Sequence, residues 1–430
     1  MAPFLLLDAL FFSCVIFTVW YFSTRTKAGP VKIALVEKDS LPDPDPLYDF
    51  DLEHATTRNH LYVNKTVRWP YYQTMSHQPM HINDWIEIDK DLKWYIDEKA
   101  RVIAEKGRHV IDSTPDNDEA CGELMEILVD YLPKRYPTLF EKIDCKGSGI
   151  WNKVTDERLT NLEGKKGVDA LMVCSRLVQD DFLMGRERED GEVYFTGGLV
   201  AFPGKCFSRA SHISWLTLIR TGFYLLSRKI NKTMKQVHAP VPYFHEKILM
   251  SVERTLKRFK PTEPFERTSW EIVDDRNLHW HGIASLHNDQ ELPKELHPKD
   301  LFFRVDHQTF RKLPRTKGII FGVHPIMKRI EDFADSPLIP ALLTKVHLEA
   351  DEKLMKYKVA PAYQERLLPY LAELTSAQIE RGLITGTEEV AAFRELIKDK
   401  KYPNTQTSLA KPTDSEQLLS TLASPHPGGR

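Results

Sequence analysis

The longest run of apolar residues lies at the N-terminus. Residues Phe4 to Phe22 contain a single charged side chain, that of Asp8. A helix of this length nearly crosses the hydrocarbon core of a bilayer. Basic residues follow the run and none precedes it, which predicts a membrane anchor with the body of the protein in the cytosol. We therefore expect a single-pass anchor over residues 1–24, in the endoplasmic reticulum, and not a cleaved signal peptide, which needs a basic region before the run.

Helical spacing of apolar residues recurs in three later segments. The first extends from Leu92 to Ile103 and the second from Leu124 to Tyr131, where Pro133 is expected to end the helix. The third extends from Ile248 to Phe259 and precedes another proline. These segments predict three amphipathic helices.

Five short apolar runs, bounded by glycine and proline, predict β-strands. They are LMVC from Leu171, VYFTGGLVAF from Val193, SWEIV from Ser269, LFFRV from Leu301 and GIIFGV from Gly318. Few helical segments separate these runs, which favours an antiparallel sheet over a doubly wound parallel one. Neither a GxGxxG nor a GxxxxGK[ST] motif is present, so nucleotide-binding folds are disfavoured. The pattern predicts an α+β fold.

The ends of the chain differ in composition from its middle. Lys38–Asp51 is acidic and rich in proline, and we expect a linker over residues 25–66 before a domain over residues 67–400. Asn404–Arg430 is rich in small and polar residues, which predicts a disordered tail over residues 401–430.

Charge and cysteine content exclude several classes of protein. The net charge of the 430 residues is -2, which gives no reason to expect a nucleic-acid partner. The five cysteines form no CxxC pair, so a disulfide scaffold and a zinc ribbon are not expected. The closely spaced cysteines of a plant-type iron–sulfur cluster are also missing. Any electrons that the protein uses must therefore come from elsewhere.

The segment Val237-His238-Ala239-Pro240-Val241-Pro242 is a candidate for metal or cofactor binding. Its two prolines fix their own φ angles and push the residues before them towards extended conformations. His238 thus lies on a stiff loop that leads into the third predicted helix, where its imidazole can bind a metal. A histidine that caps or packs against a helix start is the alternative.

Polar side chains alternate along the strand that begins at Leu301. Arg304, Asp306 and Gln308 are expected on one face, with Val305 and His307 on the other. The polar face can bind a carboxylate. A solvated edge strand is the alternative. A second group of histidines and tryptophans lies between Trp270 and His287. The spacing of His279 and His281 would suit a weak metal site, but no carboxylate or cysteine supports them, so a metal site there is disfavoured.

Short segments from about Arg68 to about Leu374 occur in the order of one known family. They include Arg68-Trp69-Pro70-Tyr71, Asn83-Asp84-Trp85-Ile86-Glu87-Ile88-Asp89, Tyr131-Leu132-Pro133, Leu177-Val178-Gln179-Asp180-Asp181, Phe202-Pro203, His238-Ala239-Pro240-Val241-Pro242, Arg267 with Trp270, and Arg304 to Pro314. Through them the chain resembles the α-subunit-like family of haem-dependent oxidative N-demethylases, and its fungal members in particular.

The resemblance implies a PAS-like fold that binds haem b. It implies a monooxygenase-type oxidoreductase that removes a methyl group from a small amine or oxidises a related metabolite, in a fungal biosynthetic pathway. NADPH would supply electrons through a separate reductase. Because PAS folds often sense and do not catalyse, a haem-binding sensor or carrier without catalytic activity is the alternative.

Within the resemblance, His238 is the expected axial ligand of the haem iron, with His212, His324 and Cys206 as alternatives. The resemblance also makes Arg267, Arg304 and Gln308 candidates for contacts with the haem propionates or for polar groups of the site.

The chain departs from the family pattern in two places. Asp306 and His307 stand where the family usually has glutamate and arginine, so a positive charge is lost or becomes dependent on pH. Phe207–Leu226 is an additional apolar segment where relatives are shorter, and it is either an extra helix or a translated intron.

Overall fold

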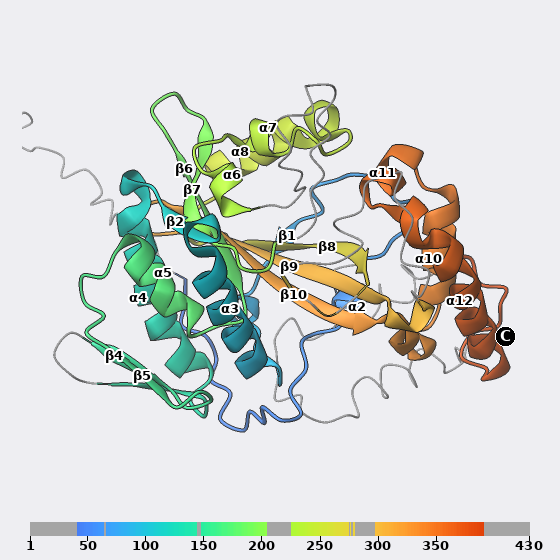
Figure 1. Cartoon of the computed structure of the whole chain (residues 1–430), viewed down its shortest axis with the longest axis horizontal. Coiled ribbons are helices and arrows are strands. Elements are labelled where there is room, and N and C mark those ends of the chain that lie inside the picture. Colours follow the sequence, from blue (N-terminus) through green and yellow to red (C-terminus); the bar gives the residue numbers. More distant parts are fainter. Residues whose placement is uncertain are drawn as a thin grey trace, which may run out of the picture. The chain divides into compact units, whose positions relative to one another are not determined.

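The computed structural model describes residues 41–63, 66–143, 148–203, 225–274, 276, 278–279 and 297–390. Its centre is a seven-stranded antiparallel sheet in the order β1-β8-β9-β10-β6-β7-β2 (Figure 1). In chain order these strands are β1 (Gln78–Pro79), β2 (Ile111–Ser113), β6 (Asp181–Glu187), β7 (Val193–Leu199), β8 (Phe265–Val273), β9 (Phe302–Lys312) and β10 (Ile319–Arg329). A smaller antiparallel sheet contains β3 (Phe140–Lys142), β4 (Gly149–Asn152) and β5 (Glu157–Thr160). The predicted α+β fold with a large antiparallel sheet is confirmed.

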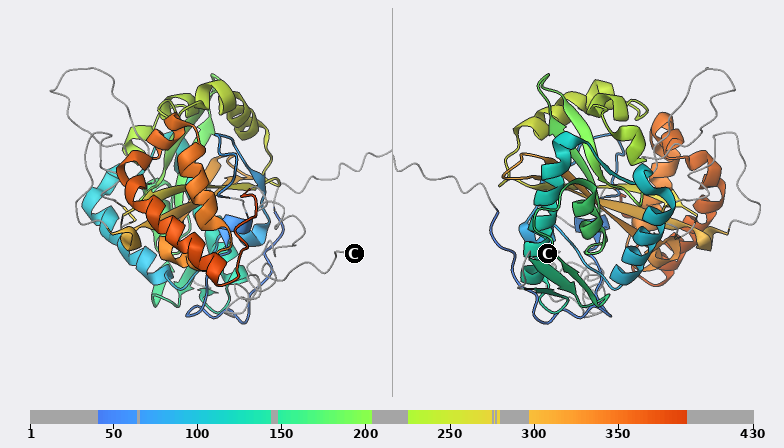
Figure 2. Two further views of the ribbon diagram at one scale, coloured as in Figure 1. Left: turned by 90° about the vertical axis from the view of Figure 1, so that its right-hand side faces the viewer. Right: turned by 60° about the vertical axis from the view of Figure 1, so that its left-hand side comes forward.

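Helices pack against the large sheet in three groups, which the two views of Figure 2 separate. The first group is α3 (Leu92–Lys106), α4 (Asp118–Arg135) and α5 (Gly167–Ser175), whose apolar residues share a core with Phe182 of β6 and Ile320 of β10. The second is α6 (Leu226–Lys229), α7 (Met234–Val237), the π-helical turn η4 (Phe244–Ile248) and α8 (Leu249–Arg258). The third is α10 (Ile339–Glu349), α11 (Glu352–Tyr357) and α12 (Ala360–Glu380), which share a core with Trp270 and Phe303.

Shorter elements connect these groups. They are α2 (His60–Val63) and the 3-10 turns η1 (Ile82–Asp84), η2 (Gly107–His109), η3 (Pro115–Asn117), η5 (Pro298–Asp300) and η6 (Ile330–Asp335). The turn η1 and the residues after it lie close to α2 and to the residue Arg58 before it, as the contacts of Asp84 with Arg58 and of Glu87 with His60 show.

The register of the long strands sorts their side chains between two faces, because successive residues of a strand point in opposite directions. Opposite each other on one face are Arg267 and Gln308, Ser269 and Asp306, and Glu271 and Arg304. On the other face His307 of β9 lies opposite Thr268 of β8 and His324 of β10. The predicted separation of Arg304, Asp306 and Gln308 from Val305 and His307 is therefore confirmed. The expectation of a solvated edge strand is wrong, since β9 lies between β8 and β10.

Four of the five predicted strands correspond to β7, β8, β9 and β10. The strand predicted at Leu171 is wrong, because LMVC belongs to the helix α5 and packs against α4. A run of four apolar residues carries too little periodicity to separate helix from strand. All three predicted helices exist, but Pro133 lies inside α4 and the helix continues to Arg135.

Several predictions concern residues outside the described ranges. The anchor segment Phe4–Phe22, the tail 401–430 and nearly all of Phe207–Leu226 are among them. In the described part of the chain no helix is both long enough and apolar enough to cross a membrane. From residue 41 onward, the segment predicted as a linker packs on the domain: Leu47 is buried, and its N–H donates to the carbonyl of Arg135 at 2.9 Å.

Candidate functional site

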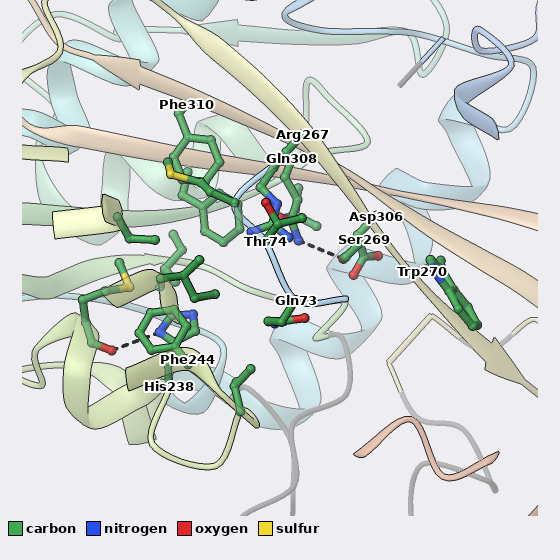
Figure 3. A pocket seen from close by; sticks show the side chains of 18 of the residues that line it. Gln73, Thr74, His238, Phe244, Arg267, Ser269, Trp270, Asp306, Gln308 and Phe310 are labelled. Carbon is green, nitrogen blue, oxygen red and sulfur yellow. Dashed lines mark hydrogen bonds between the residues drawn. The ribbon is translucent and has the colours of Figure 1, made fainter. Parts of the chain in front are cut away.

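A cavity of about 270 Å³ lies between the large sheet and the second helical group (Figure 3). Strands β6 to β10 form one wall, and residues from Met234 to Leu256 form the facing wall. The segment Tyr71–Met75 and the end of α11 complete the lining. Because the volume is just below the usual range for ligand pockets, roughly 300–1,000 Å³, the cavity as it stands suits a small molecule.

The strand wall has an aromatic end and a polar end. At the aromatic end, the rings of Phe310 and Phe321 stack with centroids 4.7 Å apart. At the polar end, the side-chain amide of Gln308 donates to the hydroxyl of Ser269 at 3.0 Å, and Arg267 lies opposite Gln308 on the neighbouring strand. This wall therefore offers an apolar surface for a flat ligand and donors for a carboxylate.

The facing wall contains His238, which directly follows the last residue of α7. Thr233 and Gln236 cap the other end of this short helix by bonding reciprocally to each other's backbone N–H groups. Nδ1 of His238 lies 3.0 Å from the carbonyl oxygen of Met234, and its ring stacks on Phe244. Since a carbonyl only accepts, Nδ1 carries the proton and Nε2 keeps its lone pair.

Burial lowers the pKa of His238 to about 4, so its imidazole is neutral at physiological pH. A neutral imidazole whose second nitrogen donates to a backbone carbonyl is the usual state of a metal-ligating histidine. The alternative of a helix-start cap does not describe this residue, which follows the end of α7, although packing against Phe244 is part of its role.

Arg267, Gln308 and His238 all line the cavity, but Arg304 does not. The guanidinium of Arg304 is fully buried and donates to the carboxylate of Asp306 at 2.8 Å and to the carbonyl of Phe202 at 2.8 Å. Asp306 and Phe202 do line the cavity. Arg304 thus lies beside the lining, on the same face of β9, where it orients a lining carboxylate; a direct contact with a cofactor stays a prediction.

The alternative ligands lie elsewhere. His324 is buried on the opposite face of the sheet from the cavity, next to His307 in the register. His212 and Cys206 are outside the described residues. In the region rich in histidine and tryptophan, Nδ1 of His279 donates to the carbonyl of Ala201 at 2.7 Å, and the neighbouring residues 280–296 are not described. Of these candidates, only His238 is a described residue of the cavity lining.

Phe244 and Ser269 are among the residues of the site that were not predicted from the sequence. Phe244 fixes the plane of the His238 ring, and Ser269 fixes the amide of Gln308. Alternation along β9 predicts that Gln308 lies on the polar face. Ser269 lies on the same face of the neighbouring strand, which only the register of β8 with β9 shows. Phe244 belongs to a π-helical turn, and the spacing of apolar residues does not distinguish this turn from an ordinary helix start.

The lining is compatible with haem in its chemistry. It supplies one neutral imidazole, apolar and aromatic walls, and cationic or amide donors at Arg267 and Gln308 for carboxylates. In volume it is small for a macrocycle, so haem binding requires the walls to separate.

Comparison with known families gives an independent result. The model of a family described as haem-dependent oxidative N-demethylase, alpha subunit-like, matches residues 76–368, which is more than half of the chain. The match includes η1, the large sheet from β1 to β10, and the whole segment from α6 to α8. It begins and ends close to the limits of the resemblance seen in the sequence.

Proposed function

We propose that this chain, which belongs to the haem-dependent oxidative N-demethylase, alpha subunit-like family, is a haem-binding oxidoreductase that oxidises a small amine. The observation that supports this most directly is His238, a neutral imidazole of fixed tautomer in the lining of the cavity. The mixed fold with a large antiparallel sheet agrees with the PAS-like fold that we propose for it.

The residues of the cavity have separate roles in this proposal. His238 would ligate the iron through Nε2, while Met234 and Phe244 hold its ring in position. Arg267 and Gln308 would bind the propionates, and the aromatic pair Phe310–Phe321 would exclude water. When bound, haem supplies the redox chemistry, and the protein supplies binding, orientation and exclusion of water.

The electrons would come from NADPH through a separate reductase. Of the described cysteines, Cys121 and Cys174 are buried in the apolar core, and burial raises the pKa of the Cys121 thiol to about 12. Neither is placed to carry an exposed redox centre. We propose that the reductase docks on the outer surface, and that removal of a methyl group releases formaldehyde and water, with one dioxygen and one NADPH consumed.

Haem titration and turnover test the proposal together. Purified full-length protein is loaded with haem, and the Soret band gives the stoichiometry. A panel of N-methylated secondary amines is then tested with NADPH and a reductase, with formaldehyde as the readout. Formaldehyde release at the expense of NADPH is the expected result. Haem binding without turnover of any amine would instead favour the sensor or carrier, and absence of a Soret band would overturn haem binding altogether.

A further inference from the structure

A buried cluster of imidazoles and carboxylates lies on the face of the sheet opposite the cavity. One ligand atom each from His60, Glu87 and His307 lies within 4.8 Å of the other two, and all three residues are at most 3% exposed. In the described part of the chain this is the one such group of three. The residues come from α2, the segment after η1 and the centre of β9, so the fold alone brings them together.

The contacts within the cluster match those of a metal site before the metal binds. Nε2 of His60 lies 3.3 Å from a carboxylate oxygen of Glu87, and the two imidazoles stack with centroids 4.4 Å apart. Ligands about 2.1 Å from a tetrahedral metal lie roughly 3.4 Å from one another. Rotation of one imidazole out of the stack, with small movements of the other two side chains, would bring all three atoms to one ion.

A second group of residues surrounds the cluster. Nε2 of His307 lies 2.6 Å from a carboxylate oxygen of Glu266, and Arg58 pairs with both Glu87 and Glu266. Carboxylates that orient a ligating histidine through its second nitrogen are usual around protein metal sites. Glu266 is itself held by the side-chain amide of Gln78 at 2.8 Å.

Buried acidic groups are concentrated in this region. Three buried carboxylates, those of Asp84, Glu87 and Glu266, face the single guanidinium of Arg58. A cation bound at the cluster would lie beside two of these carboxylates, since Glu87 is a member of the cluster and Glu266 lies against His307.

From these observations we propose that His60, Glu87 and His307 bind a divalent transition-metal ion, with Glu266 orienting His307. Two imidazoles and one carboxylate suit zinc or a neighbouring first-row metal, whereas calcium and magnesium prefer sets of oxygen ligands. The site is separate from the cavity, yet His307 lies between Asp306 and Gln308, which both line it. The ion would tie α2 and the segment at Glu87 to β9 and so fix the strand that carries the polar end of the cavity.

Zinc binding to the full-length protein tests this proposal without reference to haem or activity. The protein is purified without a histidine tag, stripped with a chelator, and titrated with Zn²⁺ against a chromophoric competitor. We expect one tightly bound zinc per chain and a higher melting temperature with zinc. His307→Arg keeps a hydrogen-bond donor for Glu266, and we expect it to lose zinc affinity by at least 100-fold without losing the fold. Glu266→Gln should bind zinc about 10–100-fold more weakly than the wild type.

His347→Asn is the matched control, because His347 is also a buried histidine but lies in the third helical group. It should bind zinc as the wild type does. Co²⁺ provides a second readout, since its visible absorption reports nitrogen and oxygen ligands around the ion, and His307→Arg should abolish the wild-type spectrum. Failure of the wild type to bind zinc stoichiometrically, or equal zinc affinity and an equal cobalt spectrum in His307→Arg, would overturn the site and leave a proton-bearing charge network in its place.

Discussion

The imidazole of His238 lies parallel to the phenyl ring of Phe244, with centroids 4.5 Å apart and planes inclined by 16°. The bond from Nδ1 to Met234 fixes the rotation of the ring within that plane. Two independent contacts therefore set the direction of Nε2 without help from a ligand. Such preorganisation reduces the entropy that binding must otherwise cost.

The first prediction follows from this relationship. His238→Ala should abolish or greatly weaken haem binding, seen as loss of the Soret band, while the apo-protein still melts cooperatively. His324→Ala is the control, because that histidine is buried on the opposite face. It should lower the melting temperature and leave the Soret band unchanged. The reverse pattern, with the band lost only in His324→Ala, would move the ligand to the other face of the sheet.

Arg304 provides a second prediction. Arg304→Met leaves the buried carboxylates of Asp306 and Glu271 without their guanidinium, and the loss of one partner of a buried ion pair typically costs about 3–5 kcal/mol. Gln308→Ala, on the same face of the strand, removes one hydrogen bond and should cost roughly 1 kcal/mol. Urea denaturation of the two variants measures both values. Similar costs for both would show that Arg304 does not hold its neighbours as the structure indicates.

Features of this fold are predictable from the sequence where the residues that indicate them lie in one short segment, and not where distant residues come together. Helices α3, α4 and α8 were predictable from the helical spacing of their apolar residues, and strands β7 to β10 from short apolar runs bounded by glycine and proline. The strand β6 escaped prediction, since Asp181 to Gly185 are all buried and show no alternation. His238 was recognisable from neighbouring prolines within one short segment. The cluster of His60, Glu87 and His307 was not, because its members are far apart in the sequence and only the register of β9 places them together.

A third prediction concerns the close pairing of β6 and β7. Gly198 has φ +143°, and a Cβ there would collide with the carbonyl oxygen of Phe182. Gly198→Ala should therefore destabilise the protein by about 3 kcal/mol or more, from backbone strain and overpacking together. Gly191, with φ +77° and open space around it, is the matched control, and Gly191→Ala should cost only about 1–2 kcal/mol. Equal melting temperatures for the two variants would contradict the close approach of β7 to β6 at Gly198.

The membrane anchor expected at the N-terminus gives a fourth prediction. The full-length chain should sediment with membranes and resist extraction by high salt, because Phe4–Phe22 is apolar. A chain that begins at residue 41, the first described residue, should be found in the supernatant and still give the same haem spectrum. Recovery of the full-length chain in the supernatant would show that the segment does not hold the protein in a membrane.

A fifth prediction concerns pH and His347, which packs in the third helical group. Its Nδ1 donates to the carbonyl of Leu343 at 2.7 Å, and its Nε2 lies 3.3 Å from the hydroxyl of Tyr363. Burial lowers the pKa of His347 in the folded protein from its ordinary value of 6.5 to about 4. Between these two values the unfolded chain binds a proton that the folded chain does not, so stability must rise with pH.

The contribution of His347 to the free energy of unfolding is thus fully present above about pH 6.5 and is lost as the pH falls towards 4. The loss amounts to roughly 3 kcal/mol in all, at about 1.4 kcal/mol per pH unit where it is steepest. In His347→Asn, which keeps a donor for Leu343 but does not titrate, this part of the pH dependence should vanish. Urea denaturation of both proteins between pH 5 and pH 7.5 isolates the effect, because the other buried histidines are common to both. A constant difference in unfolding free energy across that range would mean that His347 is not protonated on unfolding, and would contradict its burial as a neutral group.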